Sequence, residues 1–294
     1  MNDLMTEEKI VPLNNVTEGP ATFIIHSIEG IATPLLNLGS MLNVPCYCIQ
    51  NYYGAPQDTI ENMADHYIQI IKEKQPTGPY RLVGYSYGAS IAFEMAAKLQ
   101  ALHPDNPKIL DCLILLDGSH HYMNMYRNVY RIAYGVESET LVGDKLFESE
   151  LLTAFTLRFA NVDYQSFRNE LMAVNNWEER VQAVGKTVMN TGLFKNEEVI
   201  TYSCNGLRNR FYAGDLYNPN RKYNGDVILI RAEKSAGREA DVKRDYGISE
   251  VITGDVEVHI VEGDHDSFIQ GTSSSTTAQI MTTCLKKYSA KTES

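Results

Sequence analysis

The sequence predicts an α/β fold built on a mostly parallel sheet, and three observations predict it. Short apolar segments typical of strands alternate with amphipathic segments typical of helices. Residues 109–116 are almost all apolar, as expected for a strand that is buried on both faces of a sheet. Between about residues 121 and 222 the periodicity is helical, so a block of helices interrupts the α/β pattern.

The first half of the chain supplies most of the expected core. Residues 1–20 are polar and contain two prolines, which predicts a linker or mobile arm. Residues 59–75 have apolar side chains close to a 3.6-residue period, and residues 88–100 have a face of small side chains. The other segments are short runs rich in apolar or β-branched residues. The expected order is strand 21–26, helix 34–42, strand 44–50, helix 59–75, strand 80–84, helix 88–100 and strand 109–116.

The second half begins with the helical block and then returns to the α/β pattern. The expected elements are helices at 150–159, 166–174 and 178–191, strands at 226–231 and 256–261, and a final helix at about 276–288. We therefore expect a core formed by residues 21–120 and 223–294, with residues 121–222 inserted as a helical cap. This layout is typical of a hydrolase with a cap over its sheet.

Length and composition restrict the classes of function. The chain has 294 residues, 44% hydrophobic and 21% charged, so it can bury a core without disulfide or metal staples. The net charge of −11 is the wrong sign for a general nucleic-acid or anionic-membrane binder. No apolar run approaches the roughly 18 residues of a membrane helix, and no signal peptide is recognisable. The five cysteines lack metal-site or redox spacing, so we expect a cytoplasmic protein with reduced thiols.

One pentapeptide points to a chemistry. Gly84-Tyr85-Ser86-Tyr87-Gly88 is a G-x-S-x-G sequence that follows an expected strand and opens an expected helix. A strained turn there lifts the Ser86 hydroxyl above the sheet edge, and the flanking glycines leave it room. The helix N-terminus beneath it favours developing negative charge. The context predicts an α/β-hydrolase fold with Ser86 as nucleophile; the alternative is an ordinary glycine-rich turn with a capping serine.

His265 is the predicted base. A serine hydroxyl is a poor nucleophile at neutral pH and needs a neighbouring base, for which this fold uses a late histidine. Of seven histidines, His265 follows the last expected strand, at the carboxyl edge of the sheet where ligands bind in open α/β folds. His259 lies within that strand, and His66 and His103 lie in or beyond helices, so we expect packing or surface roles for them.

Asp117 is the predicted acid that orients the imidazole. It ends the apolar strand that directly follows the nucleophile helix, so its loop should neighbour that of the serine. Asp264 and Asp266 are too close to His265 in sequence to be the first choice. Many hydrolases take the acid from a later strand, and the competitors at that position are Glu233, Asp241 and Asp245.

The oxyanion hole of such an enzyme needs two backbone N–H donors. Tyr87, the residue after the nucleophile, is expected to supply one. Ile28, in the loop at residues 27–30 after the first expected strand, is expected to supply the other. The chain has no HGGG sequence, which argues against that class of lipase and esterase.

Together these residues resemble the thioesterase domain of animal fatty acid synthase. The resemblance implies a triad of Ser86, Asp117 and His265, with oxyanion N–H groups at Ile28 and Tyr87. The matching stretches occur in family order over about residues 22–271; they are Gln75–Ala89, His26-x-Ile28-Glu29-Gly30, Asp117-Gly118-Ser119, Trp177–Val181, Tyr223-x-Gly225-x-Val227 and Val258–His265.

The resemblance also implies a reaction and a partner. A long-chain fatty acid of palmitate type would be released from the phosphopantetheine arm of an acyl carrier protein, which terminates fatty acid synthesis. The acyl group would pass to Ser86 as an ester and then be hydrolysed by water that His265 activates. No diffusible cofactor and no metal is expected. Carrier proteins are themselves usually acidic, so the charge of −11 favours a carrier tethered in the same polypeptide, where effective concentration replaces attraction.

Two features depart from the family. Asp266 follows His265 where the vertebrate enzymes carry a basic residue, which puts in doubt a charge contact to the carrier there. The helical block is much less similar than the core, although we expect it to supply the acyl groove. A long acyl chain gains about 0.8 kcal/mol per buried methylene. The candidate groove residues, which could instead simply pack the cap onto the core, are Tyr122, Tyr126 and Tyr130 on one helix face, then Phe155, Leu157 and Phe159.

Other functions stay open. The release domain of an animal polyketide synthase, or a stand-alone editing thioesterase, would use the same chemistry. A carboxylesterase or lipase would prefer oxygen esters to thioesters. A catalytically dead hydrolase fold that binds lipid or a partner usually lacks a triad residue, whereas all three residues are present here.

Overall fold

The structure is a computed structural model of the chain. It describes residues 7–106, 108–137, 141, 143–194, 196–235 and 242–292. At positions 126, 128, 130, 133, 134 and 288–292 it describes the backbone but not the side chains. Within these described residues, no helix combines the length and the hydropathy needed to cross a bilayer.

A seven-stranded sheet forms the centre of the molecule, in the order β1-β3-β2-β4-β5-β6-β7. All neighbouring strands are parallel except β1, which runs antiparallel to β3. This confirms the mostly parallel sheet. The strands are β1 (Ile10–Pro12), β2 (Thr22–Ile25), β3 (Cys46–Ile49), β4 (Tyr80–Tyr85), β5 (Leu110–Leu116), β6 (Val227–Lys234) and β7 (Val256–Asp264).

The expectation of a mobile arm over residues 1–20 misses strand β1. Its three residues pair with β3, in a register that places Ile10 opposite Ile49 and Pro12 opposite Tyr47. A three-residue segment is too short to show a period of two, so its sequence carries no strand signal. Pro12 has no N–H to donate, which suits a strand at the edge of a sheet.

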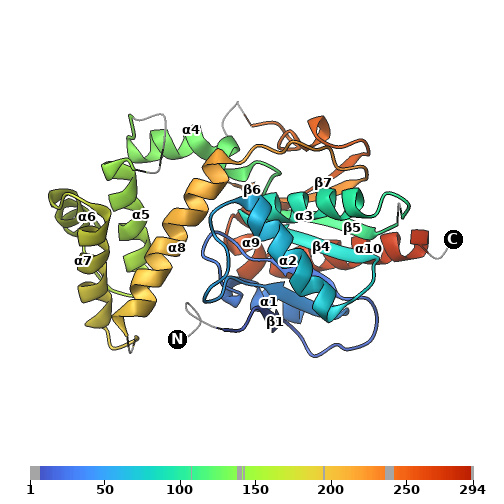
Figure 1. Ribbon diagram of the computed structural model, residues 1–294, viewed down its shortest axis with the longest axis horizontal. Coiled ribbons are helices and arrows are strands. Elements are labelled where there is room, and N and C mark those ends of the chain that lie inside the picture. The colour runs from blue at the N-terminus through green and yellow to red at the C-terminus, as the bar shows by residue number, and fades with distance from the viewer. Residues whose placement is uncertain are drawn as a thin grey trace.

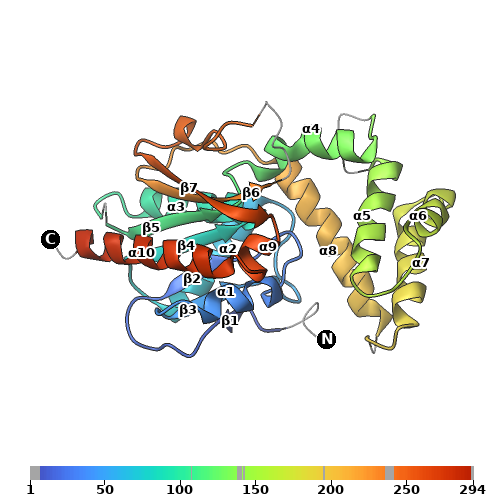
Figure 2. The same ribbon diagram turned by 180° about the vertical axis from the view of Figure 1, so that it is seen from behind.

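Helices cover both faces of the sheet (Figures 1 and 2). Alternate side chains of each strand point to opposite faces, so neighbouring residues enter different cores. Leu113 and Leu115 pack in the core beneath α2 (Ile60–Lys74) and α3 (Gly88–Leu102). Ile114 and Leu116 pack in the opposite core, whose helices are α1 (Leu36–Ser40), α9 (Ser267–Gln270) and α10 (Ser274–Thr292). Double coverage explains why β5 is apolar throughout.

The helical block lies to one side of the sheet, and α8 runs from it back to the core (Figure 1). It has an apolar core of its own, which includes Leu152, Phe167 and Trp177. Its helices are α4 (Tyr122–Tyr134), α5 (Lys145–Leu157), α6 (Tyr164–Ala173), α7 (Trp177–Met189) and α8 (Glu197–Leu216). Helix α5 begins before its expected start because the Asp144 side chain accepts a hydrogen bond from the Phe147 N–H and caps it.

Helix α8, with 20 residues, is a long element that periodicity did not single out. It packs against the sheet domain and the cap at once, and its buried residues include Arg210 and Asp215 as well as apolar side chains. A helix buried on several sides, with charged groups among its buried positions, has no single apolar stripe for periodicity to detect.

Burial in the core can be tested on helix α3. Leu99 is 0% exposed and Leu102 is 60% exposed, so the two leucines form a matched pair on one helix. Leu99→Ala removes buried methyl groups and leaves a cavity, and we expect it to lower the free energy of unfolding by about 2–5 kcal/mol. Leu102→Ala should change it by less than about 0.5 kcal/mol. Urea unfolding followed by circular dichroism measures both; equal losses would contradict the packing described here.

Candidate active site

The turn between β4 and α3 holds Ser86 in a left-handed backbone conformation, with φ of +57°. A Cβ at Gly84 would lie 2.5 Å from the Gly88 carbonyl oxygen, and a Cβ at Gly88 would lie 2.3 Å from the His26 carbonyl oxygen. Both positions therefore admit only glycine without a backbone shift. This close packing is the physical reason for the spacing of the pentapeptide.

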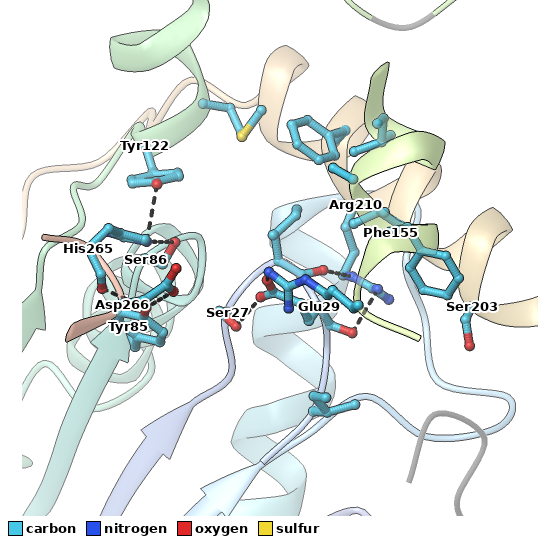
Figure 3. A pocket seen from close by; sticks show the side chains of 18 of the residues that line it. Ser27, Glu29, Tyr85, Ser86, Tyr122, Phe155, Ser203, Arg210, His265 and Asp266 are labelled. Atoms are coloured by element: carbon cyan, nitrogen blue, oxygen red, sulfur yellow. Dashed lines mark hydrogen bonds and ion pairs between the residues drawn. The ribbon is translucent and has the colours of Figure 1, made fainter. Parts of the chain in front are cut away.

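Three of the predicted side chains converge at the carboxyl edge of the sheet. His265 follows the end of β7, and its Nε2 lies 2.8 Å from Ser86 Oγ. Its Nδ1 lies 2.7 Å from Oδ2 of Asp117, which follows the end of β5. The carboxylate can only accept, so Nδ1 carries a proton and Nε2 is left to accept the Ser86 O–H. Figure 3 shows His265 directed at Ser86.

Asp117 is fully buried, and its carboxylate is held by more than the histidine. Its Oδ1 accepts hydrogen bonds from Tyr246 Oη at 2.8 Å, from Ser235 Oγ at 2.5 Å and from the Ala232 N–H at 3.2 Å. Sequence reasoning missed Ser235 and Tyr246. They lie more than 100 residues along the chain from Asp117, and a lone serine or tyrosine gives no local signal of such a contact.

Charge pairing sets the protonation of both groups. Burial opposes a charged imidazole, but the hydrogen bond and negative charge of Asp117 outweigh it and raise the pKa of His265 above its ordinary value. Burial would also raise the pKa of Asp117, but hydrogen bonds from His265, Ser235 and Tyr246 and the charge of His265 lower it. The aspartate is therefore ionised at neutral pH.

The competing acids that the structure describes either form other hydrogen bonds or are exposed. Asp245 accepts hydrogen bonds from the backbone N–H groups of Gly247 and Ser249, and Glu233 is exposed on β6. Asp241 falls outside the described residues. Asp266 Oδ1 lies 3.4 Å from the Tyr85 hydroxyl, which also donates to the His265 carbonyl at 2.9 Å. Tyr85, inside the pentapeptide, thus holds the histidine loop.

Three other histidines have structural surroundings. His26 and His120 are buried, and burial lowers the pKa of each to about 3. His259 lies on β7 beside Glu257, with their side chains 3.0 Å apart. Cys284 lies close to this pair, and the three side chains could approach one metal ion. The second Glu257 oxygen, however, binds Lys287 Nζ at 2.7 Å, so a cation already neutralises this carboxylate.

A cavity of about 370 Å³ opens at Ser86 and extends under the cap. Tyr122, Phe155 and Phe159 line it, as do Ile28 and His265. The Tyr122 hydroxyl lies 3.5 Å from His265 Nε2 (Figure 3). The Tyr126 side chain falls outside the described residues. The remaining aliphatic and phenylalanine side chains of the wall are Ile31, Met123, Leu151, Ala154, Leu207 and Phe211.

An ion pair joins the cap to the loop beside Ser86. Arg158, just after α5, places Nη2 2.6 Å from Glu29 Oε1. Burial would raise the pKa of Glu29, but the charge of Arg158 and the hydrogen bond from Ser27 outweigh it and lower that pKa. Glu29 is therefore ionised, and it lines the cavity together with its partner Arg158.

Comparison with known proteins identifies the kind of domain. A family model described as "Thioesterase domain" matches residues 21–288. The chain is 38% identical to the vanchrobactin synthetase VabF of Vibrio anguillarum over 88 residues, 28% of this chain and 3% of VabF. It is 36% identical to the polyketide synthase PksR of Bacillus subtilis strain 168 over 100 residues, 33% of this chain and 4% of PksR. The chain thus spans a small part of these curated relatives.

Among solved structures, the NocB thioesterase domain in covalent complex with a fluorophosphonate nocardicin G analogue is similar in fold. Its TM-score is 0.59, with 21% sequence identity over 94% of this chain and 99% of that one. At this identity the likeness concerns the fold, and it agrees with the α/β-hydrolase architecture described above.

The pairing of His265 with Asp117 can be measured directly. Because the carboxylate raises the pKa of His265, we expect a value above the ordinary 6.5 in NMR titration of labelled histidine, assigned with a His265→Gln variant. Asp117→Asn removes that charge and should lower the pKa of His265. Asp245→Asn, the matched control, should leave it unchanged because Asp245 bonds elsewhere. An unchanged value in Asp117→Asn would contradict the pairing.

Proposed function

Because this chain belongs to the thioesterase domain family, we propose that it is a serine hydrolase that releases a long-chain fatty acid from the phosphopantetheine arm of an acyl carrier protein. The observation that carries the proposal is the continuous set of hydrogen bonds from Ser86 through His265 to Asp117. Each atom in it has the donor or acceptor role that nucleophilic catalysis by serine requires.

In the first half of the reaction, the Ser86 Oγ attacks the thioester carbonyl. His265 Nε2 takes the hydroxyl proton and then donates it to the departing thiolate sulfur, so a free thiol leaves and an ester on Ser86 remains. Ionised Asp117 stabilises the imidazolium that forms in between. The buried hydroxyl groups of Ser235 and Tyr246 donate to the Asp117 carboxylate and keep it directed at Nδ1 while the imidazolium forms and is discharged.

The oxyanion of the tetrahedral intermediate needs donors that are already in place. The N–H groups of Ile28 and Tyr87 are our candidates, because their loop and turn meet beside Ser86. Among the described residues, neither N–H donates a hydrogen bond to another backbone group of a turn, loop or cap. Tyr87 is also the N-cap residue of α3, whose N-terminus favours the negative charge.

The second half hydrolyses the ester. Water takes the place of the departed thiol, His265 removes one of its protons, and attack on the acyl carbonyl regenerates the Ser86 hydroxyl and releases a carboxylic acid. No group outside the chain and water is needed to balance these steps.

The substrate class rests on the cavity and on the sequence resemblance. The walls of the cavity under the cap are mostly apolar and include Phe155, Phe159 and Phe211. An acyl chain gains about 0.8 kcal/mol for each methylene that it buries there. The curated relatives are multidomain synthetases and synthases, which favours a carrier supplied within a larger assembly.

A second candidate has its own supporting observation. PksR is a polyketide synthase, and VabF is a vanchrobactin synthetase. Release of a polyketide or peptidyl chain would use the same Ser86 chemistry, with a different chain in the cavity. A panel of pantetheine thioesters of equal length, with plain, β-keto and aminoacyl chains, decides between them: the fatty acid proposal requires the highest kcat/KM for the plain chain.

The nucleophile is tested by Ser86→Ala. Loss of the hydroxyl should lower kcat for thioester hydrolysis by roughly 10⁴- to 10⁶-fold and abolish covalent labelling by a fluorophosphonate. Ser40→Ala, an exposed serine on α1, is the matched control and should keep both activities. Thioester hydrolysis by Ser86→Ala at the wild-type rate would contradict the mechanism. A strong preference for oxygen esters over thioesters of one acyl chain would instead point to an esterase.

The acyl groove is tested on helix α5. Ala154 lines the cavity and has an exposed side chain, so Ala154→Phe should narrow the groove without disturbing the core. We expect kcat/KM for a sixteen-carbon thioester to fall about tenfold relative to an eight-carbon one, as if two methylenes lost their burial. Leu157→Phe is the control, because Leu157 is 41% exposed and does not line the cavity. An equal change for both chain lengths would contradict the assignment.

A further inference from the structure

We infer that Arg210, on cap helix α8, is a positioning residue that holds the loop carrying the Ile28 N–H in place for oxyanion stabilisation. The inference rests on the proposed function, in which that N–H is a donor. It assigns the cap a role in the chemical step as well as in acyl binding, because Arg210 belongs to the cap and the loop belongs to the sheet domain.

The guanidinium of Arg210 contacts the loop in two places. Nε donates to the Ile28 carbonyl at 2.7 Å, and Nη2 donates to the Glu29 carbonyl at 3.2 Å. Nη1 donates to Gln57 Oε1 at 2.6 Å, which fixes the remaining side of the group. Figure 3 shows Arg210 beside Glu29, with dashed lines to the loop. A planar fork that bonds in three directions leaves the loop little freedom to tilt.

The surrounding backbone leaves room for this side chain. Gly30 has φ of +82°, and a Cβ there would lie 3.1 Å from Arg210 Cζ. A Cβ at Gly206, one turn before Arg210 on α8, would lie 2.9 Å from Nη1 and 2.5 Å from Gln57 Oε1. Both glycines thus sit against the guanidinium, one on the loop and one on the helix. The absence of a Cβ at Gly30 and at Gly206 therefore leaves space for the guanidinium on both sides.

A second contact holds the loop from the sheet side. His26 Nδ1 lies 2.6 Å from the Ser27 carbonyl oxygen, and Nε2 lies 2.7 Å from the Tyr67 hydroxyl. Burial, with the nearby charge of Arg210, lowers the pKa of His26 to about 3, so the ring is neutral. The carbonyl can only accept, so Nδ1–H donates to it and Nε2 accepts from Tyr67.

These contacts fix where the Ile28 N–H points. A peptide unit is planar, with its C=O and N–H directed to opposite sides. The Ile28 N–H shares a peptide unit with the Ser27 carbonyl, which His26 holds. The next peptide unit carries the Ile28 carbonyl, which Arg210 holds. The two units on either side of the Ile28 Cα are therefore held, one from the core and one from the cap.

Attachment of the cap alone does not explain a buried arginine at this position, because burial removes water from its charge. Arg210 is 3% exposed, and the three hydrogen bonds that the structure gives it go to carbonyl or amide oxygens. Burial lowers the pKa of its guanidinium, and nearby groups, Glu29 among them, offset this effect only in part. Apolar residues of similar volume join packed elements without desolvating a charge. Fixed dipoles at a charged site, by contrast, are what an oxyanion hole requires.

The test measures the chemical step separately from binding. Arg210→Met and Arg210→Lys are compared with wild type for kcat and KM on an acyl-pantetheine thioester. We expect kcat to fall about 10- to 100-fold in Arg210→Met with KM within about twofold, and a smaller fall in Arg210→Lys. Inhibition by an alkyl boronic acid, which forms a tetrahedral anion on serine, should weaken in the same proportion as kcat. Binding of the unreactive thioether with the same chain should not change.

Controls separate positioning from stability of the cap. Arg208→Met, on the same helix, removes a guanidinium that pairs with Glu148 inside the cap and does not contact the loop, so it should keep the wild-type kcat. Gly206→Ala keeps every charge and crowds Arg210 and Gln57, and it serves where Arg210 variants do not fold. We expect it to lower kcat and boronate affinity together.

Two outcomes would overturn the inference. One is an unchanged kcat in Arg210→Met and Gly206→Ala. The other is an equal loss of affinity for the boronic acid and the thioether, which would mean a damaged cavity. Failure of the proposed function is recognised separately, because it would appear as full hydrolysis by Ser86→Ala in an otherwise wild-type chain.

Discussion

The structure depends on the close backbone packing around Ser86. Strand β4 must turn into α3 within a few residues, with the serine at positive φ, while α3 begins against the end of β2. Three glycines make this approach feasible, because a Cβ at Gly84, Gly88 or Gly118 would lie within 2.5 Å of a backbone oxygen. The serine hydroxyl, the neighbouring loops and the start of α3 take their places from this one contact.

The parallel sheet then concentrates chemistry at one edge. Parallel strands end at the same side, so the segments after β2, β4, β5 and β7 meet there, although they are far apart in sequence. These segments carry Ile28, Ser86, Asp117 and His265. Asp117 bridges the set, because one oxygen binds the histidine while the other is held by buried donors.

The cap is attached to this edge by charged groups as well as by apolar packing. Arg158 pairs with Glu29, and Arg210 bonds the carbonyl oxygens of the same loop. Between these contacts lies the cavity, with apolar walls from α5 and α8. An enclosed site of this kind excludes water from charged groups and so strengthens their interactions. The position of the cap and the geometry of the loop beside Ser86 are therefore physically linked.

The sequence by itself determined the elements with a strong local signal: the apolar strands, most helices and the G-x-S-x-G turn, because period, small residues and chain order are local properties. It also nominated Asp117 and His265 from their places after strands. Only the tertiary structure decided the partners that depend on distant packing. The short edge strand β1, the support of Asp117 by Ser235 and Tyr246, and the burial of Arg210 against Ile28 have no local signature. Their energies arise from contacts between residues that are neighbours only in the folded chain.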